Sequence, residues 1–171
     1  MSLPPDASGN AFPAQEPAAF LNGQFIPFSE AKLPLYDAGL VLGATVTDFV
    51  RTFRLQLYRL RDHLERFYDS CRLAEIPLNA SVEVLTQISE ELIARNARLL
   101  SRGQELALIL IATSGAVPFY AGNQNIATEP TLAIHTTPLN LRGMASFFES
   151  GIHLVTPEVR AIPKSCIDPR I

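Results

Sequence analysis

The sequence has no tryptophan, only two cysteines and no long apolar segment. Cys71 and Cys166 stand far apart and outside any metal-ligand spacing, which suits a compartment where thiols stay reduced. No stretch approaches the roughly 20 apolar residues that a transmembrane helix needs, and residues 1–17 have neither the basic start nor the apolar run of a signal peptide. We therefore expect a cytoplasmic protein that has no membrane segment.

An excess of positive charge is also missing. The chain has 14 Lys and Arg against 17 Asp and Glu, a formal net charge of -3, and the two signs are interspersed. A surface that neutralises a phosphate backbone is therefore not predicted, and nucleic acid is not an expected partner. His63, His135 and His153 have no partner at i, i+4 and no cysteine cluster beside them, so no metal site is predicted.

The composition of the chain is typical of a globular protein with a hydrophobic core. Of the 171 residues, 47% are hydrophobic and 18% charged. The Asn22-Gly23 pair lies between apolar residues and predicts a tight hairpin, because both residues accept positive φ. Residues rich in β-branched and aromatic types predict strands near 46–53 and 56–60. The run ELALILIATS at 105–114 has no alternation of apolar and polar residues and predicts a buried central strand, and 131–139 predicts a returning strand.

Two amphipathic helices are predicted between these strands. Over 62–76 apolar residues recur every three or four positions, with Asp62 placed to begin the helix and Pro77 to end it. The second helix covers 82–98, with Ser81 or Asn79 as its cap. These elements predict an α+β fold in which an antiparallel sheet carries helices on one face.

The distribution of these elements also predicts domain boundaries. We expect a flexible arm over 1–17, a small α+β domain over 18–137 and a connection over 138–150. Residues 151–171 supply too little to bury a core of their own, so they are expected to begin a second, larger domain.

On its own, Arg66 on the first helix is best interpreted as part of a solvated face, paired with Asp62 or Asp69. Asp37 is expected to cap backbone amides rather than to act as an acid or base. A dyad of His63 with Cys71 is excluded, because eight helical residues separate their backbones by roughly 12 Å.

A series of motifs nevertheless resembles the N-terminal domain of class IV aminotransferases, the fold-type IV pyridoxal-phosphate enzymes that include branched-chain and D-amino acid aminotransferases and aminodeoxychorismate lyase. The motifs run without a gap from Asp37 to Arg66: Asp37-Ala38-Gly39 with Gly43, then Asp48, Arg51 and His63-Leu64-Glu65-Arg66-Phe67, preceded by Asn22-Gly23. Arg160 and the tail ending Asp168-Pro169-Arg170-Ile171 resemble later landmarks of the family.

The resemblance implies pyridoxal 5'-phosphate as cofactor, and it implies that Arg66 binds the cofactor phosphate, to which a guanidinium is well matched. It implies no catalytic residue within the chain, because the Schiff-base lysine is expected immediately after Ile171. Candidates for the wall of the substrate pocket are Thr47, Asp48, Arg51, Ser114 and Tyr120. A homodimer is expected, in which partner domains complete each other's sites, with an amino donor and a 2-oxo acid as small-molecule partners.

The chain departs from the family at several of these positions. Thr47 stands where many relatives have an aromatic residue, Asp48 where they have glutamate, and Ser114 where the D-amino acid enzymes and the lyase have arginine. Leu55 replaces the glycine expected in the second hairpin turn. Transamination of an amino acid is the predicted activity. A pyridoxal-phosphate-dependent lyase, or a non-catalytic binding protein that retains the fold, are the alternatives.

Overall fold

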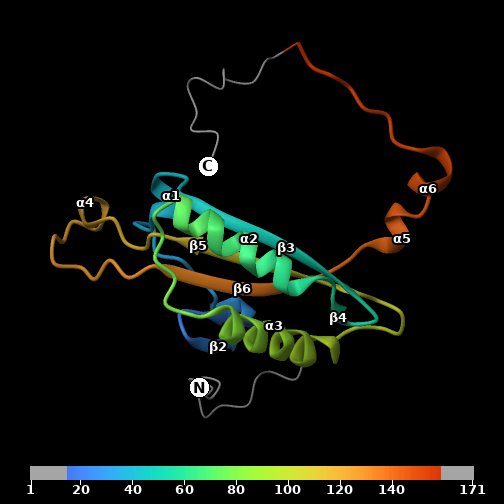
Figure 1. Cartoon of the computed structure of the whole chain (residues 1–171), viewed down its shortest axis with the longest axis horizontal. Coiled ribbons are helices and arrows are strands. Elements are labelled where there is room, and N and C mark those ends of the chain that lie inside the picture. The colour runs from blue at the N-terminus through green and yellow to red at the C-terminus, as the bar shows by residue number, and fades with distance from the viewer. Residues whose placement is uncertain (1–14, 159–171) are drawn as a thin grey trace.

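The structure, a computed structural model, describes residues 15–158. Most of the predicted N-terminal arm and the tail from residue 159, with Lys164 and the motif that ends at Ile171, lie outside the described residues. The elements in chain order (Figure 1) are β1 (Ala18–Leu21), β2 (Gln24–Pro27), the 3-10 helix η1 (Phe28–Glu30), α1 (Ala38–Val41), β3 (Thr45–Phe53), β4 (Gln56–Leu57), α2 (Leu60–Leu73), α3 (Val82–Ala97), β5 (Leu106–Thr113), α4 (Pro118–Ala121), β6 (Thr131–Pro138), α5 (Leu141–Met144) and α6 (Phe147–Ser150).

Six strands form one sheet in the order β2-β1-β6-β5-β3-β4, and every neighbouring pair is antiparallel. The apolar strand β5 pairs with β6 from Leu106 to Thr113 and with β3 from Ala107 to Thr113. A strand with neighbours on both sides has its backbone groups satisfied within the sheet and needs apolar side chains on a buried face. The prediction of a central strand at 105–114 in an antiparallel sheet is therefore confirmed.

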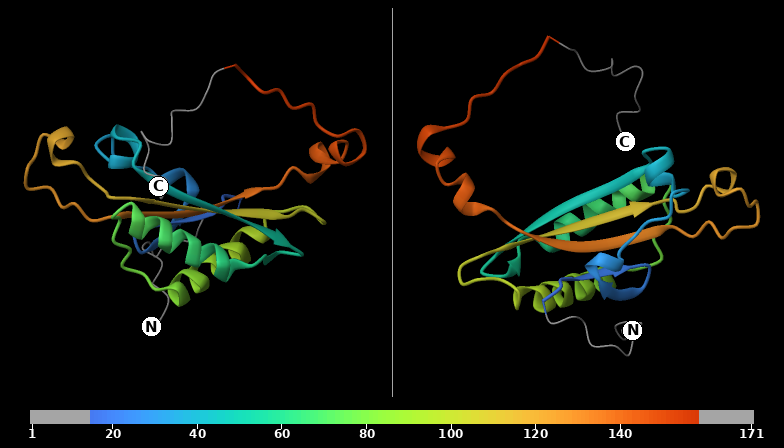
Figure 2. Two further views of the ribbon diagram at one scale, coloured as in Figure 1. Left: turned by 45° about the horizontal axis from the view of Figure 1, so that its top comes forward. Right: turned by 180° about the vertical axis from the view of Figure 1, so that it is seen from behind.

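Both long helices lie on the same side of the sheet (Figure 2). Their apolar positions face it: Leu64, Phe67 and Cys71 of α2 and Leu85, Ile88 and Leu92 of α3 are each at most 1% exposed. These side chains pack with Val50, Leu108, Leu110 and Ile134 of the sheet into one core. The apolar residues that recur every 3.6 positions on the helices therefore pack against those that recur every second position on the strands. They form one apolar layer between helices and sheet, as predicted.

The ends of the first helix differ from the prediction. α2 begins at Leu60, and its N-cap is Arg59, which has a left-handed backbone (φ 51°) and no side-chain capping bond. Asp62 lies inside the first turn and pairs with the Arg59 side chain. The helix ends at Leu73, ahead of Pro77, and Glu75 takes a positive φ of 56° in the following turn. For α3 the predicted cap is confirmed, because Oγ of Ser81 accepts the N–H of Val84 at 3.3 Å.

Asp37 joins the start of α1 to the ends of two strands. Its carboxylate is fully buried and accepts the N–H of Gly39 at 2.8 Å, together with the hydroxyls of Thr113 at 3.0 Å and Thr131 at 2.9 Å. The predicted capping role of Asp37 is confirmed. Because the two threonines belong to β5 and β6, the bonds also fix the loop that leads into β3.

β6, the last strand in chain order, ends at Pro138. The segment 139–158 then leads away from the sheet through the short helices α5 and α6 (Figure 1). Large apolar side chains in this segment are exposed, among them Phe148 at 88% and Leu154 at 85%. Across residues 15–158 the structure contains no helix with the length and apolar character needed to cross a bilayer.

Candidate functional site

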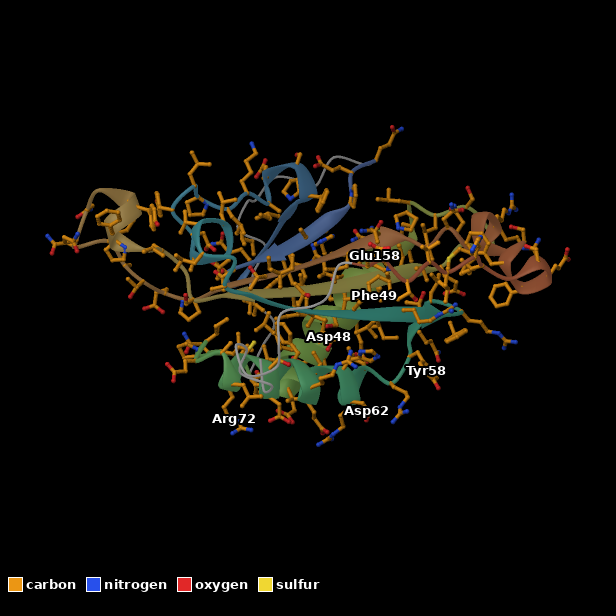
Figure 3. All side chains as sticks on the ribbon, turned by 90° about the horizontal axis from the view of Figure 1, so that it is seen from above. Asp48, Phe49, Tyr58, Asp62, Arg72 and Glu158 are labelled. Atoms are coloured by element: carbon orange, nitrogen blue, oxygen red, sulfur yellow. The ribbon has the colours of Figure 1, made fainter. Side chains whose placement is uncertain are left out.

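Strand β3 presents different side chains to the two faces of the sheet. Asp48, Val50 and Thr52 are buried on the helix side, whereas Thr47 and Phe49 are exposed on the opposite side. This follows from the two-residue period of a strand, which alternates successive side chains between faces. In Figure 3 Asp48 accordingly lies between β3 and α2, and Phe49 lies on the other side of the strand. An aspartate on the core side of a strand requires polar partners.

Those partners come from α2 and from the strand itself. Nε of Arg66 donates to Oδ2 of Asp48 at 2.8 Å, and Nη2 of Arg66 donates to Oδ1 at 2.8 Å. Oδ1 also lies 2.8 Å from Nδ1 of His63 and accepts the N–H of Phe49 at 2.7 Å. The carboxylate therefore makes four hydrogen-bonding contacts with three residues, while its side chain is only 2% exposed.

The bidentate contact fixes the direction of the Arg66 guanidinium. One edge of the guanidinium, formed by Nε and Nη2, is held against Asp48, yet the Arg66 side chain is 64% exposed. Among residues 15–158, Nη1 donates to no protein group. The result is a planar cation that is anchored on one edge and presents its other donors to solvent.

At Asp48 the effect of burial on the pKa is outweighed by the hydrogen bonds and the nearby positive charge taken together. Burial acts to raise the pKa of Asp48, but the hydrogen bonds from Arg66, His63 and the Phe49 N–H, with the charge of Arg66, lower it below its ordinary value of 3.8. The pKa of Arg66 is raised by its hydrogen bond to Asp48 and by the charge of that carboxylate. Both groups are therefore charged at neutral pH.

The interpretation of Arg66 from residue spacing alone was wrong about its partner. Asp62 pairs with Arg59 and Asp69 pairs with Arg72, both through exposed contacts on the outer side of α2. Arg66 instead reaches across to the sheet. The geometry brings together Asp48, His63 and Arg66, and of these His63 was not among the site residues predicted from the sequence.

The predicted pocket residues do not form one cluster. Thr47 and Arg51 share the open face of the sheet, while Asp48 points to the helix face. Arg51 pairs with Ala107, and Ser114 follows the other end of β5, so these two candidates lie about 23 Å apart along the strand. That separation is too large for both to contact one small molecule within this chain.

Arg51, Ser114 and Tyr120 each lie in a different surrounding. The guanidinium of Arg51 lies 3.9 Å from the ring centre of Phe53, a cation–π contact on the open face. Ser114 is exposed directly after β5. Tyr120 lies on the short helix α4, is 53% exposed, and its ring packs edge-on against the ring of the neighbouring Phe119.

Comparison with known proteins identifies the class to which this fold corresponds. The described residues have the fold of the N-terminal part of fold-type IV aminotransferases. The branched-chain amino acid aminotransferase of Escherichia coli superposes with a TM-score of 0.61 at 19% identity, covering 72% of this chain and 41% of that one. A hypothetical aminotransferase from Mycobacterium tuberculosis, in its PLP-bound form, gives a TM-score of 0.62 at 19% identity, covering 75% and 42%. No protein-family model matches the chain.

Proteins with similar sequences are also named aminotransferases. The D-alanine aminotransferase of Staphylococcus aureus (strain N315) is 30% identical over 139 residues, which are 81% of this chain and 47% of that protein. The putative branched-chain-amino-acid aminotransferase of Methanocaldococcus jannaschii is 28% identical over 155 residues, 89% of this chain and 49% of that protein. The chain spans about half the length of the curated relatives it matches. The resemblance to class IV aminotransferases is confirmed, and these relatives give no support to the lyase or non-catalytic alternatives.

Proposed function

We propose that this chain contributes the phosphate-anchoring part of a pyridoxal 5'-phosphate-dependent aminotransferase, which moves an amino group from an amino acid to a 2-oxo acid. The observation that carries the proposal is the anchored guanidinium of Arg66. The sequence relatives of this chain are named aminotransferases, and one structural neighbour was determined in a PLP-bound form.

The geometry of Arg66 fits a phosphate group. A guanidinium offers parallel N–H donors that match phosphate oxygens, and charge-assisted bonds of this kind are among the stronger polar contacts in proteins. A flexible exposed arginine would lose side-chain entropy when it binds an anion. Asp48 removes most of that loss beforehand, because it holds Nε and Nη2 in place and leaves Nη1 free to donate.

In such an enzyme the cofactor ring supplies the electron sink that allows an amino group to leave one carbon skeleton and join another. The residues of this chain would bind and orient. Arg66 would hold the phosphate, Asp48 would hold Arg66, and the open face of β3 with Thr47 and Phe49 would form a wall beside the bound molecule. The residues that react with the amino group would lie in the half of the relatives that this chain does not span.

Four further expectations belong to the proposal: the assembly, the compartment, the small-molecule partners and the second domain. The protein acts as a homodimer in the cytoplasm, with an amino donor and a 2-oxo acid as its small-molecule partners. Residues 138–150 connect the sheet to a second domain that begins at residue 151, which is supported by the exposed apolar side chains of Phe148 and Leu154. A second domain packed on this segment would remove that apolar surface from water.

The test is the retention of cofactor by Arg66 variants of the full-length protein. Arg66→Ala should lose the visible absorption of bound cofactor during dialysis, because the phosphate loses its charged donors. Arg66→Lys should restore retention only in part, since a point charge cannot make a two-pronged contact. Arg61→Ala is the matched control, because Arg61 lies on the same helix and pairs with Glu65 at 2.8 Å on the exposed side.

Equal retention by Arg66→Ala and the parent protein would refute the anchoring role. Transamination itself is tested by adding an amino acid to the holoenzyme, removing the excess, and offering one 2-oxo acid at a time while following the cofactor spectrum. A spectrum that returns to its starting form only when a 2-oxo acid is added supports transfer. Release of product without any 2-oxo acid would favour a lyase instead.

A further inference from the structure

An open cavity of about 330 Å³ lies at one end of the sheet. Its walls come from the turn between α3 and β5 and from the residues that follow β6, and they include Ser101, Arg102, Gln104, Leu139, Asn140 and Arg142. The two segments lie side by side because β5 and β6 pair as far as Leu106 and Pro138. The Leu139 N–H extends this pairing with a 2.9 Å bond to the carbonyl oxygen of Glu105. Figure 1 shows both segments at the same end of the sheet.

Both segments that line the cavity are closed by short-range hydrogen bonds. In the first turn the Gln104 N–H donates to the Ser101 carbonyl oxygen at 3.1 Å, and Oε1 of Gln104 accepts the Ser101 N–H at 2.7 Å. After β6, Oδ1 of Asn140 accepts the N–H of Gly143 at 3.0 Å. Each amide side chain therefore uses its oxygen on the backbone. Its NH2 group has no protein partner among residues 15–158 and remains available as a donor.

The two arginines of the cavity are cations without a counter-charge. In the part of the chain that the structure describes, the side chains of Arg102 and Arg142 make no ion pair or hydrogen bond, and no carboxylate lines the cavity. The nearest carboxylate in sequence, that of Glu105, instead accepts the N–H groups of Arg54 and Leu55 in the β3–β4 turn. Two like charges that share one cavity repel each other, and an anion bound between them would remove that repulsion.

A phosphate dianion has the charge and the acceptor oxygens that match this lining. Guanidinium groups donate parallel N–H bonds to phosphate oxygens, and the amide NH2 groups can donate to the oxygens that remain. A volume of about 330 Å³ also accommodates a small phosphate ester, since small-molecule sites begin at roughly 300 Å³. We infer that this cavity binds a phosphate group, either free or carried by a small ester, through Arg102 and Arg142.

A bound phosphate would join two parts of the chain that are distant in sequence. Arg102 precedes β5 in the sheet, whereas Arg142 lies on α5, in the connection that follows β6. The anion would therefore fix the direction in which the chain leaves the sheet. This inference goes beyond the proposed function, because the site is separate from Arg66. Asp48, which holds Arg66, pairs with Leu110, and roughly 13 Å of β5 separate Leu110 from Leu106 beside the cavity.

The test titrates inorganic phosphate into the full-length protein and follows the backbone amide resonances of Gly103 and Gly143, which should shift and saturate together. Arg102→Gln and Arg142→Gln should each weaken binding about tenfold, because each removes charge-assisted contacts to the anion. Arg98→Gln is the matched control. Arg98 lies at the end of α3, donates to the carbonyl oxygen of Arg95 at 3.1 Å and does not line the cavity, so its replacement should preserve the affinity.

Further measurements need only the parent protein. Phosphate should slow hydrogen exchange at the amides of residues 139–144, and glycerol phosphate should bind more tightly than inorganic phosphate if an ester is the ligand, or equally if free phosphate is. Chloride at the same ionic strength should cause no saturating shift. Resonances that do not respond to phosphate, or equal weakening by Arg98→Gln, would overturn the inference, since the latter indicates attraction to overall charge. Arg66→Ala should leave this binding intact, so the inference and the proposed function can fail separately.

Discussion

Replacing Asp48 by asparagine tests whether the buried carboxylate is held by charge. The carboxylate makes four hydrogen-bonding contacts, and two of them come from the guanidinium of Arg66. Hydrogen bonds to charged groups contribute about 1.5–3 kcal/mol each, but the Arg66 side chain is 64% exposed and recovers water when its partner loses charge. Asparagine still offers an oxygen to the Phe49 N–H. We therefore expect Asp48→Asn to lower the free energy of unfolding by about 2 kcal/mol.

The pH dependence of this difference provides a stricter test. The pKa of Asp48 in the folded protein lies below its ordinary value of 3.8, so its stabilising contribution is complete above that value. The contribution disappears as the pH falls through the lower pKa of the folded state. Urea unfolding of the parent and of Asp48→Asn should differ by a constant amount from about pH 5 to pH 8, and the two should converge below about pH 4.

Asp69→Asn is the matched control for this experiment. Asp69 lies on α2 and pairs with Arg72 at 3.3 Å, but both side chains are at least 70% exposed, so its loss should change stability by no more than about 0.5 kcal/mol. Equal effects of the two substitutions would refute the reasoning, since it attributes the cost to burial. A difference between parent and Asp48→Asn that grows below pH 4 would also refute it.

Three other changes have expected outcomes. Leu55→Gly should raise the urea midpoint, by about 0.5–1 kcal/mol in free energy, because Leu55 adopts φ 61° in the β3–β4 turn; a lower midpoint would show that packing by the leucine matters more. Gly115→Ala should cost more than 2 kcal/mol or so, because a Cβ there would lie 1.9 Å from a backbone oxygen of the neighbouring loop, whereas Gly122→Ala has open space and should cost about 1 kcal/mol. Burial raises the pKa of Cys71 to about 11, so in a Cys166→Ser background the native protein should react with a thiol reagent only as fast as it unfolds.

The fold was largely predictable because its signals are local. The helix period over α2 and α3, the Asn22-Gly23 turn and the apolar run of β5 each depend on residues close together in sequence. Helix ends were less predictable, since α2 begins after Arg59 in a left-handed conformation that a single sequence does not indicate. The same holds for the β3–β4 turn, where Glu105 accepts the N–H groups of Arg54 and Leu55 from fifty residues away.

The site was predictable only in part, because its contacts join residues that are distant in sequence. Spacing along α2 offered Asp62 and Asp69 as partners of Arg66, while the true partner lies 18 residues earlier on another element. A signal was nevertheless present: strand alternation places Asp48 on the same face as Val50 and Thr52, and a buried carboxylate requires a cation. His63 could have been included by the same argument, since it precedes Arg66 by three residues and shares its helix face.

The alternation along β3 separates the residues that form an exposed surface from the residues that stabilise the core. Residues at odd positions, such as Thr47 and Phe49, face away from the core, and those at even positions, such as Asp48 and Val50, maintain the packing and the anchor. A library that randomises only the odd positions would therefore vary one molecular surface while leaving the framework that fixes Arg66 unchanged. Divergence within this strand can proceed on one side without a loss of stability on the other.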